Sequence, residues 1–550
     1  MSRSPSRAPV ARDADAVRPV FHARHLSAVL DDGRALFSDV ELRLVPGPVA
    51  LVGANGSGKS TLLRMIVEAA SPRGGMCLAS PARICHVPQH VDIVPPRVVD
   101  LLGAGARVDA LRRLLAGEGD AEDAGLLGDD WALEATLRGA LDALGLEAIG
   151  LDADPSRLSG GQCQQLRLLA AQRSGADLLL LDEPSTFLDA DASLRWRDRL
   201  LSHPAAVLVV THDPVWLQAV DAIVELREGR LHRTGGGLEA WRAAQSTRRA
   251  MEAAALAQTQ TERARVRRAA TAARTRLARD AARGRRDARE ANQSPLLLDH
   301  RADRADRSRS RAEAGIDARL VAADAAVRVA HEAMEDAGAP EFIDPSACAL
   351  PAARQVLSFV AAHPCAPAPG APLDWVCSGP VRIALTGANG SGKSTLLRAI
   401  AGKCGLAHGT VTAHVPVQSL DQHLAQLPPH VPALDWLQAR VQIPEASEVA
   451  TRLALLGLRG GRARVPLGAL SGGERMRVAV GAAVWARPAA PLLLLDEPAS
   501  HLDFDSVDAL VAMLRAWPGA LVVVSHDPGV HAALDATHRL HLDAGGLVLA

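Results

Sequence analysis

Short, uninterrupted apolar runs recur along the chain, and each leads into a polar or glycine-rich turn. Residues 49–52, 178–181 and 207–210 are such runs in the first half. They are far shorter than the ~20 apolar residues of a membrane-spanning helix and are typical of strands buried in a parallel sheet. Between them lie longer Leu- and Ala-rich stretches such as 97–150, for which we expect helices. The pattern therefore predicts an α/β fold.

The second half repeats this pattern with apolar runs at 383–385, 492–495 and 522–524. Thirty residues separate Asp182 from His212 in the first half and Asp496 from His526 in the second. A repeat of ordered motifs at matching spacing indicates two homologous domains. We place them at residues 19–245 and 341–550, with a polar N-terminal tail at 1–18.

The segment between the domains, residues 246–340, is rich in Ala, Arg and acidic residues. We expect two long helices, 246–291 and 303–337, broken near Asn292–Pro295 because Pro295 cannot continue a helix. Residues 296–298 form an apolar triplet at the break. Residues 261–311 hold 16 Arg against 7 acidic residues, although the whole chain has a net charge of −1. A basic helical hairpin suits RNA phosphates, whereas a solvated spacer or a disordered segment is the alternative.

Each half also carries the nonapeptide Gly-Ala-Asn-Gly-Ser-Gly-Lys-Ser-Thr between a predicted strand and a predicted helix. In such a P-loop the glycines let backbone N–H groups face phosphate oxygens, the lysine reaches the terminal phosphates and the serine binds Mg²⁺. The chain has only three lysines, and Lys59 and Lys393 are two of them. The candidate ATP-binding residues of the two loops are Gly53, Asn55, Gly56, Gly58, Lys59, Ser60 and Thr61, and Gly387, Asn389, Gly390, Gly392, Lys393, Ser394 and Thr395.

A second pair of glycine-containing turns opens a later helix in each half. A helix N-terminus that follows such a turn is a second anion-binding element. The residues are Ser159, Gly160, Gly161 and Gln162 in the first half, and Ser471, Gly472, Gly473 and Glu474 in the second.

The remaining candidates follow the buried strands. Asp182 and Asp496 are suited to contact Mg²⁺, and the adjacent Glu183 and Glu497 are suited to polarise the water that attacks the γ-phosphate. His212 and His526 follow the next strand, and Gln89 and Gln418 are each expected to end a strand within reach of the metal. The predicted metal ligands are Ser60, Gln89, Asp182, Ser394, Gln418 and Asp496, and the predicted catalytic residues are Glu183, Glu497, His212 and His526.

These motifs, in this order, resemble those of the ATP-binding cassette domain. Two such domains joined by a charged helical linker resemble the F subfamily, whose members act on the ribosome rather than in transport. The resemblance implies two P-loop NTPase domains joined by a long helical hairpin linker, with ATP and Mg²⁺ as cofactors. It also implies a cytoplasmic monomer in which the two domains pair, each site facing the Ser-Gly-Gly turn of the other domain. The linker would contact rRNA and tRNA.

Some positions depart from the family pattern. Gln165 stands where many members have Arg, which Arg477 retains in the second domain, and Phe187 stands where His is usual. The chain has no Tyr, so the adenine-stacking residue is not a tyrosine. Two functional alternatives remain open: a ribosome-acting ATPase, serving either translation or antibiotic resistance, and the ATP-binding subunit of a transporter with separate membrane partners. The long basic linker favours the first, because a transporter ATPase does not need it.

Overall fold

The computed structural model describes residues 18–29, 35–68, 76–79, 83–89, 95–290, 295–334, 348–364, 372–388, 390–421, 424, 427–443, 445–486, 488–500, 502–525, 528–543 and 546–549. Two predicted site residues, Asn389 and His526, lie outside these ranges. The chain divides into two compact units. One comprises Met1–Trp241 and Ala339–Ala550, and the other is Arg242–Gly338.

The first domain is built on a six-stranded sheet in the order β5-β6-β7-β3-β8-β9. All neighbours are parallel except β8 and β9. The strands are β3 (Gly47–Val52), β5 (Ile84–Val87), β6 (Leu178–Asp182), β7 (Ala206–Val210), β8 (Ala222–Arg227) and β9 (Arg230–Gly235). Every residue of β6 and β7 is buried, as continuous apolar runs predict for central parallel strands.

A smaller antiparallel sheet, in the order β2-β1-β4, completes the strands of this domain. Its strands are β1 (Phe21–Val29), β2 (Ala35–Leu44) and β4 (Met76–Ala79). The turn expected at Asp31-Asp32-Gly33 lies outside the described residues. The helices are α1 (Lys59–Val67), α2 (Val98–Leu101), α3 (Gly105–Ala116), α4 (Ala121–Leu127), α5 (Leu133–Asp142), α6 (Gly160–Arg173), α7 (Ala190–Leu201) and α8 (Pro214–Leu217).

The second domain repeats both sheets. Its six-stranded sheet has the order β14-β15-β16-β12-β17-β18 and its three-stranded sheet the order β11-β10-β13. The strands are β10 (Gln355–His363), β11 (Leu373–Ser378), β12 (Arg382–Thr386), β13 (His408–Ala413), β14 (Val417–Leu420), β15 (Leu492–Asp496), β16 (Ala520–Val524), β17 (His538–Asp543) and β18 (Gly546–Leu549). The helices are α11 (Lys393–Ile400), α12 (Ala433–Val441), α13 (Ala446–Leu455), α14 (Gly472–Trp485), α15 (Phe504–Arg515) and α16 (Pro528–Ala533). The matching strand orders give each domain the same frame for its site.

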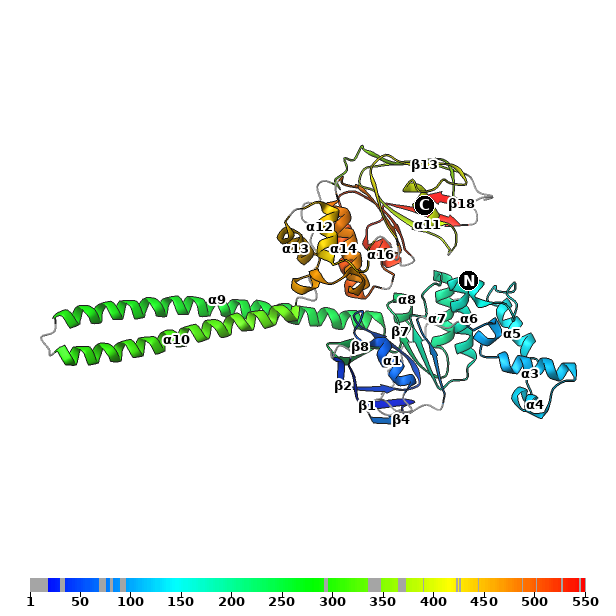
Figure 1. Cartoon of the computed structure of the whole chain (residues 1–550), viewed down its shortest axis with the longest axis horizontal. Helices are drawn as coiled ribbons and strands as arrows, with labels where there is room; N and C mark the ends of the chain where they lie inside the picture. The colour runs from blue at the N-terminus through cyan, green and yellow to red at the C-terminus, as the bar shows by residue number, and fades with distance from the viewer. Residues whose placement is uncertain are drawn as a thin grey trace. The chain divides into compact units, whose positions relative to one another are not determined.

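The other unit is a helical hairpin of α9 (Leu238–Glu290) and α10 (Pro295–Met334), drawn side by side in Figure 1. Ion pairs join the two helices: Arg263 to Asp324 (3.2 Å) and Arg267 to Asp324 (3.4 Å), with a further pair between Arg274 and Asp317. We expected the second helix to begin at residue 303, and that expectation was wrong. Pro295 begins α10, because the first position of a helix tolerates a residue without an N–H group.

The first domain carries a helical pair, α3 and α4, between β5 and the Ser-Gly-Gly turn. Arginines and acidic residues link these helices to their surroundings. Arg97 donates to both carboxylate oxygens of Asp109 (2.9 and 2.8 Å), and Arg112 contacts Glu134 and Asp152. Arg113 binds the carboxylate of Asp123, whose Oδ2 lies 2.9 Å from its Nε. These contacts add to the burial of Val108, Leu111 and Leu127 in the core of the first domain.

Candidate functional site

The sheet order brings the predicted site residues of each domain to one edge. Strand β6 ends at Asp182, β7 precedes His212, and β3 precedes the P-loop, and these three strands are consecutive in the sheet. Carboxyl ends of parallel strands therefore meet at a common edge, where ligands bind in open α/β sheets. The first site is a pocket of about 370 Å³ at this edge. It is lined by Leu36, Asn55, Gly56, Gly58, Lys59, Ser60, Thr61, Gln89, Asp182, Glu183 and Val210.

The first P-loop has a backbone that requires glycine at two positions. Gly53 has φ +155°, and a Cβ on it would lie 2.5 Å from the carbonyl oxygen of Leu226. Gly58, the N-cap of α1, has φ 107°, and its Cβ would meet Leu36 and Phe37. The loop therefore passes close to neighbouring atoms with its backbone curled, as a phosphate cradle requires.

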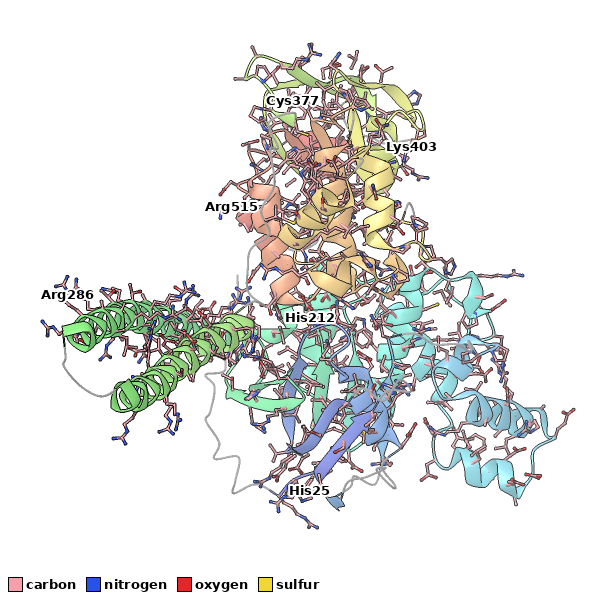
Figure 2. The ribbon with its side chains drawn as sticks, turned by 60° about the vertical axis from the view of Figure 1, so that its left-hand side comes forward. His25, His212, Arg286, Cys377, Lys403 and Arg515 are labelled. Atoms are coloured by element: carbon pink, nitrogen blue, oxygen red, sulfur yellow. The ribbon has the colours of Figure 1, made fainter. Side chains whose placement is uncertain are left out.

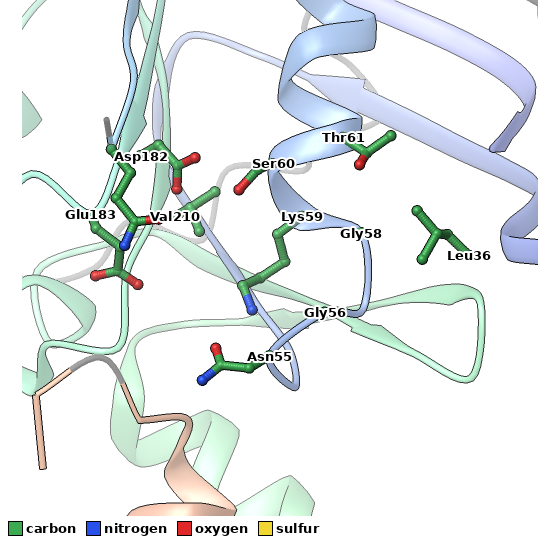
Figure 3. A pocket seen from close by; sticks show the side chains of 11 residues that line it. Leu36, Asn55, Gly56, Gly58, Lys59, Ser60, Thr61, Asp182, Glu183 and Val210 are labelled. Carbon is green, nitrogen blue, oxygen red and sulfur yellow. The ribbon is translucent and has the colours of Figure 1, made fainter. Parts of the chain in front are cut away.

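Lys59 lies inside this loop. Its Nζ donates to the carbonyl oxygens of Gly53 (2.7 Å) and Ala54 (3.0 Å). Burial lowers the pKa of Lys59, while the nearby carboxylates of Glu183, Asp503 and Asp182 oppose that shift. Figure 3 shows Lys59, Ser60, Asp182 and Glu183 around one space, with the Ser60 hydroxyl and the Asp182 carboxylate turned toward each other.

The second P-loop has the same geometry. Lys393 donates to the carbonyl oxygens of Gly387 (2.7 Å) and Ala388 (2.9 Å). Gly387, Gly390 and Gly392 have φ values of 148°, 78° and 101°. Ser394 and Thr395 stand in the first turn of α11, the positions of Ser60 and Thr61 in α1.

The glutamates proposed to act on water adopt an uncommon backbone conformation. Glu183 has φ 50° and Glu497 has φ 47°, in the left-handed region that non-glycine residues rarely occupy. Hydrogen bonds hold both residues there, from the Glu183 N–H to Val210 (2.8 Å) and from the Glu497 N–H to Val524 (3.0 Å). Strain of this kind, repeated in both domains, marks a position held for function. The sequence carries no signal for it.

Glu183 is electrostatically suited to accept a proton. Burial, and then the charge of Asp182, raises the pKa of Glu183 to about 8, against the opposing effects of Lys59 and of a hydrogen bond from the His212 backbone. A base with a pKa near neutrality is the efficient kind for proton transfer at physiological pH.

His212 follows β7 as predicted, but its ring forms no hydrogen bond with Glu183. Both ring nitrogens are buried, and neither has a hydrogen-bond partner among the described residues. Burial, and then the charge of Lys59, lowers the pKa of His212 to about 3, so the imidazole is neutral. In this conformation the His212 backbone donates a hydrogen bond to Glu183, whereas the ring nitrogens have no hydrogen-bond partner among the described residues.

The assignment of Gln418 is corrected by the register of the sheet. Gln89 lies two residues after β5 and lines the pocket, whereas Gln418 lies inside β14, opposite Leu493. Val87 pairs with Leu181 and Leu420 pairs with Leu495, so the position equivalent to Gln89 is Gln422. Gln422 lies outside the described residues. The error arose because β14 begins only at Val417, the last residue of the apolar run at 415–417, and continues through Gln418 to Leu420.

The two Ser-Gly-Gly turns open helices α6 and α14 as predicted. Ser159 and Ser471 are the N-caps, and each forms a capping box with the residue three positions on, Gln162 or Glu474. A salt bridge from Arg462 (2.6 Å) also holds Glu474. The side chains of Gln162 and Glu474 thus stabilise the turns. Gly161 and Gly473 leave no room for a side chain, because a Cβ would lie 2.7 Å from the Phe187 carbonyl oxygen and 2.2 Å from the Ser506 hydroxyl oxygen.

Sequence reasoning assigned no role to the residues that follow the acidic pairs, Asp189 and Asp503. Each N-caps its helix, Asp189 for α7 and Asp503 for α15. The second oxygen of Asp503 also accepts a hydrogen bond from the backbone N–H of Asn55 in the first P-loop, at 2.9 Å. Their identical seven-residue spacing after Asp182 and Asp496 marks both as part of the repeat, but the sequence does not show the contact of Asp503 with the first P-loop.

The residues at this edge fit a nucleotide with Mg²⁺. Magnesium usually takes one or two carboxylates and keeps its remaining positions for phosphate and water. Ser60, Asp182 and Gln89 supply such a set at one side of the phosphate cradle. Among the described residues no group of three or more His, Cys, Asp or Glu could hold a metal ion.

Comparisons with known proteins also relate this chain to ATP-binding proteins. A family model described as "ABC transporter" matches residues 37–186 and 373–500. The tylosin resistance ATP-binding protein TlrC of Streptomyces fradiae is 32% identical over 92% of this chain and 94% of its own length. The energy-dependent translational throttle protein EttA of Mycobacterium tuberculosis is 28% identical over 90% of this chain and 86% of its own.

Two solved structures have a similar fold. One is a complex of an archaeal ribosomal stalk protein with the archaeal ribosome recycling factor aABCE1, with TM-score 0.54 and 16% identity over 94% of this chain and 87% of that chain. The other is an RNase-L inhibitor, with TM-score 0.53 and 18% identity over 95% of this chain and 88% of that chain. In the described parts of the chain, no helix has both the length and the apolarity to cross a bilayer.

Proposed function

Because this chain belongs to the ATP-binding cassette family, in its F branch, we propose that it is a Mg²⁺-dependent ATPase that acts on the ribosome in the cytoplasm. Its task there is antibiotic resistance by ribosome protection or a step of translation. The observation that carries the proposal is the similarity to the tylosin resistance protein along nearly the whole of both chains. That relative favours resistance, and the relative named as a translational throttle keeps a translation step as the second candidate.

ATP hydrolysis is assigned to the two phosphate cradles. Bound Mg²⁺ would neutralise the charge that develops on the transferred phosphoryl group. Ser60, Gln89 and Asp182 would hold it in the first site, and Ser394 and Asp496 in the second. Glu183 and Glu497 accept the proton of the attacking water, and Lys59 and Lys393 bind the terminal phosphates. ATP is sandwiched when each site meets the Ser-Gly-Gly turn of the other domain, Ser471–Gly473 or Ser159–Gly161, within one monomer.

The hairpin of α9 and α10 is assigned to RNA. Several arginines of α9 are engaged with α10, as described for Arg263, Arg267 and Arg274. Four others are exposed and make no ion pair with a described residue: Arg276, Arg279, Arg283 and Arg286. Arg286, labelled in Figure 2, stands near the end of α9. Exposed guanidinium groups at the far end of the helix are suited to RNA phosphates.

The test is co-sedimentation of the Glu183→Gln/Glu497→Gln protein with purified 70S ribosomes in ATP and in ADP. We expect pelleting in ATP only, because the variant binds ATP and cannot complete hydrolysis. Neutralising Arg276, Arg279, Arg283 and Arg286 to Gln should weaken pelleting and lower the salt slope of binding, since each lost phosphate contact changes that slope by roughly 0.7–0.9. The matched control neutralises four exposed arginines outside the hairpin, Arg173, Arg195, Arg230 and Arg464.

Resistance and translation are separated by expressing the protein in a tylosin-sensitive host. A raised inhibitory concentration that the double Gln variant does not give would support ribosome protection. Ribosome binding without any change in the inhibitory concentration would assign a translation step instead. Absence of ribosome binding at low salt, with ATP binding intact, would overturn the proposal and favour an ATP-binding subunit for separate membrane partners.

A further inference from the structure

An aromatic residue of the second domain packs into the first domain beside the first site. Phe504 follows Asp503 and begins α15, yet it packs against the hydrophobic core of the first domain. Its ring lies edge-on to the His212 imidazole, with centroids 5.6 Å apart and planes at 63°. The same ring lies 5.1 Å from the Trp241 ring at 50°. Phe504 therefore stands between a residue of the first site and a residue of α9.

Trp241 belongs to the first turn of α9, the helix that continues into the hairpin. Leu238 and Trp241 are 2% and 6% exposed and belong to the same core of the first domain. The first turn of α9 is therefore fixed to the first domain by burial. Like the two nitrogens of His212, the indole N–H of Trp241 is buried without a hydrogen-bond partner among the described residues. A buried polar group without a hydrogen-bond partner is unfavourable, so a rearrangement that supplies a partner is favoured.

The residue equivalent to Phe504 in the first domain is not aromatic. Ala190 occupies the position of Phe504 in the first domain, directly after Asp189, and it is exposed. A methyl group cannot make the edge-on ring contact that Phe504 makes with an imidazole. The two sites, which share P-loops of identical sequence, therefore differ at the residue that follows the opposite helix cap.

We propose that Phe504 is a positioning residue for His212 in the first site, and that through Trp241 it links the state of this site, but not of the second, to the first turn of α9. This inference rests on the proposed ATPase. When the second domain moves relative to the first, the ring of Phe504 moves with α15. The wall that orients His212 and the packing of Trp241 then change together.

The test measures each site separately. Turnover in the Glu497→Gln background reports the first site, and turnover in the Glu183→Gln background reports the second. Phe504→Ala should lower kcat of the first site about tenfold, because a misplaced group is costly in rate even when binding persists. The KM for ATP should change by less than about twofold, and the second site should keep its kcat. An unchanged first site, or an equal loss at both sites, would overturn the proposal.

A second variant separates positioning from simple packing. Phe504→Leu keeps an apolar side chain against the core and should preserve the thermal unfolding transition, but it removes the ring. We expect it to lose first-site kcat as Phe504→Ala does. If Phe504→Leu keeps full first-site turnover, Phe504 contributes only apolar packing and the proposed role is wrong.

The link to α9 is tested without measuring turnover. Amide hydrogen exchange of residues 238–245 is compared in ATP and in ADP, in the Glu183→Gln/Glu497→Gln protein. The protein with Phe504 should show a nucleotide-dependent difference in exchange there, and Phe504→Ala should not. Equal differences in both proteins would refute the link. Ribosome binding does not enter either experiment, so failure of the ribosomal assignment stays distinguishable from failure of this one.

Discussion

Asp503 accepts a hydrogen bond from the backbone N–H of Asn55 at 2.9 Å, although 448 positions separate the two residues in the chain. Its other carboxylate oxygen caps α15 by accepting from the Ser506 N–H at 2.9 Å. One carboxylate therefore both begins a helix of the second domain and contacts the phosphate cradle of the first. Burial opposes ionisation of Asp503, but the hydrogen bonds from Ser506 and Asn55 outweigh it and lower its pKa.

Replacing Asp503 by Asn should separate these two roles. The Asn oxygen can still cap α15, whereas its NH₂ group cannot accept from the Asn55 N–H. We expect an unchanged unfolding temperature and a loss of about tenfold in first-site turnover, measured in the Glu497→Gln background. Asp189→Asn in the Glu183→Gln background is the matched variant for the second site. A normal first site in Asp503→Asn would show that this contact is incidental.

Glu183→Gln should abolish turnover of the first site without loss of ATP binding. The amide keeps the size of the carboxylate but cannot accept the proton of the attacking water, so we expect a loss of at least about 100-fold. Residual turnover in the single variant then reports Glu497. Binding of a fluorescent ATP analogue serves as the control. Turnover that persists in Glu183→Gln/Glu497→Gln would refute the role assigned to both glutamates.

Gly53 and Gly56 of the first P-loop should differ in their response to Ala. Gly53→Ala places a Cβ 2.5 Å from the Leu226 carbonyl oxygen at φ +155°, whereas Gly56→Ala meets no atom within 4 Å at φ +80°. We expect Gly53→Ala to lower the free energy of unfolding by about 1–3 kcal/mol more than Gly56→Ala does. Denaturant unfolding measures the difference. Gly387→Ala, whose Cβ would lie 2.1 Å from the Leu542 carbonyl oxygen, should repeat the larger effect.

The helical pair α3 and α4 should be sensitive to acid. Hydrogen bonds from Arg97, Arg112 and Arg113 lower the pKa values of Asp109, Glu134, Asp152 and Asp123. A carboxylate with a lowered pKa in the folded state stabilises that state above its unfolded pKa of about 4, and the contribution disappears as the pH falls through the folded value.

Hydrogen exchange of α3 and α4 between pH 6 and pH 3 measures this loss. We expect these helices to lose protection at the acid end before β6 and β7 do. Arg113→Gln removes the contact with Asp123 and should flatten the pH dependence in α4. An identical pH dependence in this variant and in the parent protein would exclude the Arg113–Asp123 pair as its source.

Local patterns predicted much of the site because its chemistry is carried by contiguous residues. The P-loops, the acidic pairs and the helix-opening turns each follow an apolar strand or begin a helix, so periodicity places them correctly. The assignment of Gln418 was wrong because strand register depends on the partner strand. A shift of a few residues cannot be seen in an apolar run of the sequence. The predicted start of the second linker helix at residue 303 was wrong because proline can begin a helix as well as end one.

The features of the site that the sequence did not predict depend on contacts between segments far apart in the chain. Nothing near Phe504 in the sequence indicates that its ring meets His212 and Trp241. The positive φ of Glu183 is likewise imposed by its surroundings, including the Val210 carbonyl group, since glutamate has no intrinsic preference for it. Such features become visible only when the sheet edge has been assembled.

The burial of Lys59 and Lys393 also decides where this protein can react with acylating reagents. Each is 8% exposed and holds two carbonyl oxygens, whereas Lys403, the third lysine of the chain, is exposed (Figure 2). An activated ester will therefore modify Lys403 far ahead of the other two side-chain amines. Of the three lysines, Lys403 in the second domain would therefore carry most of a fluorophore attached in this way, and the lysines of both phosphate cradles would stay unmodified.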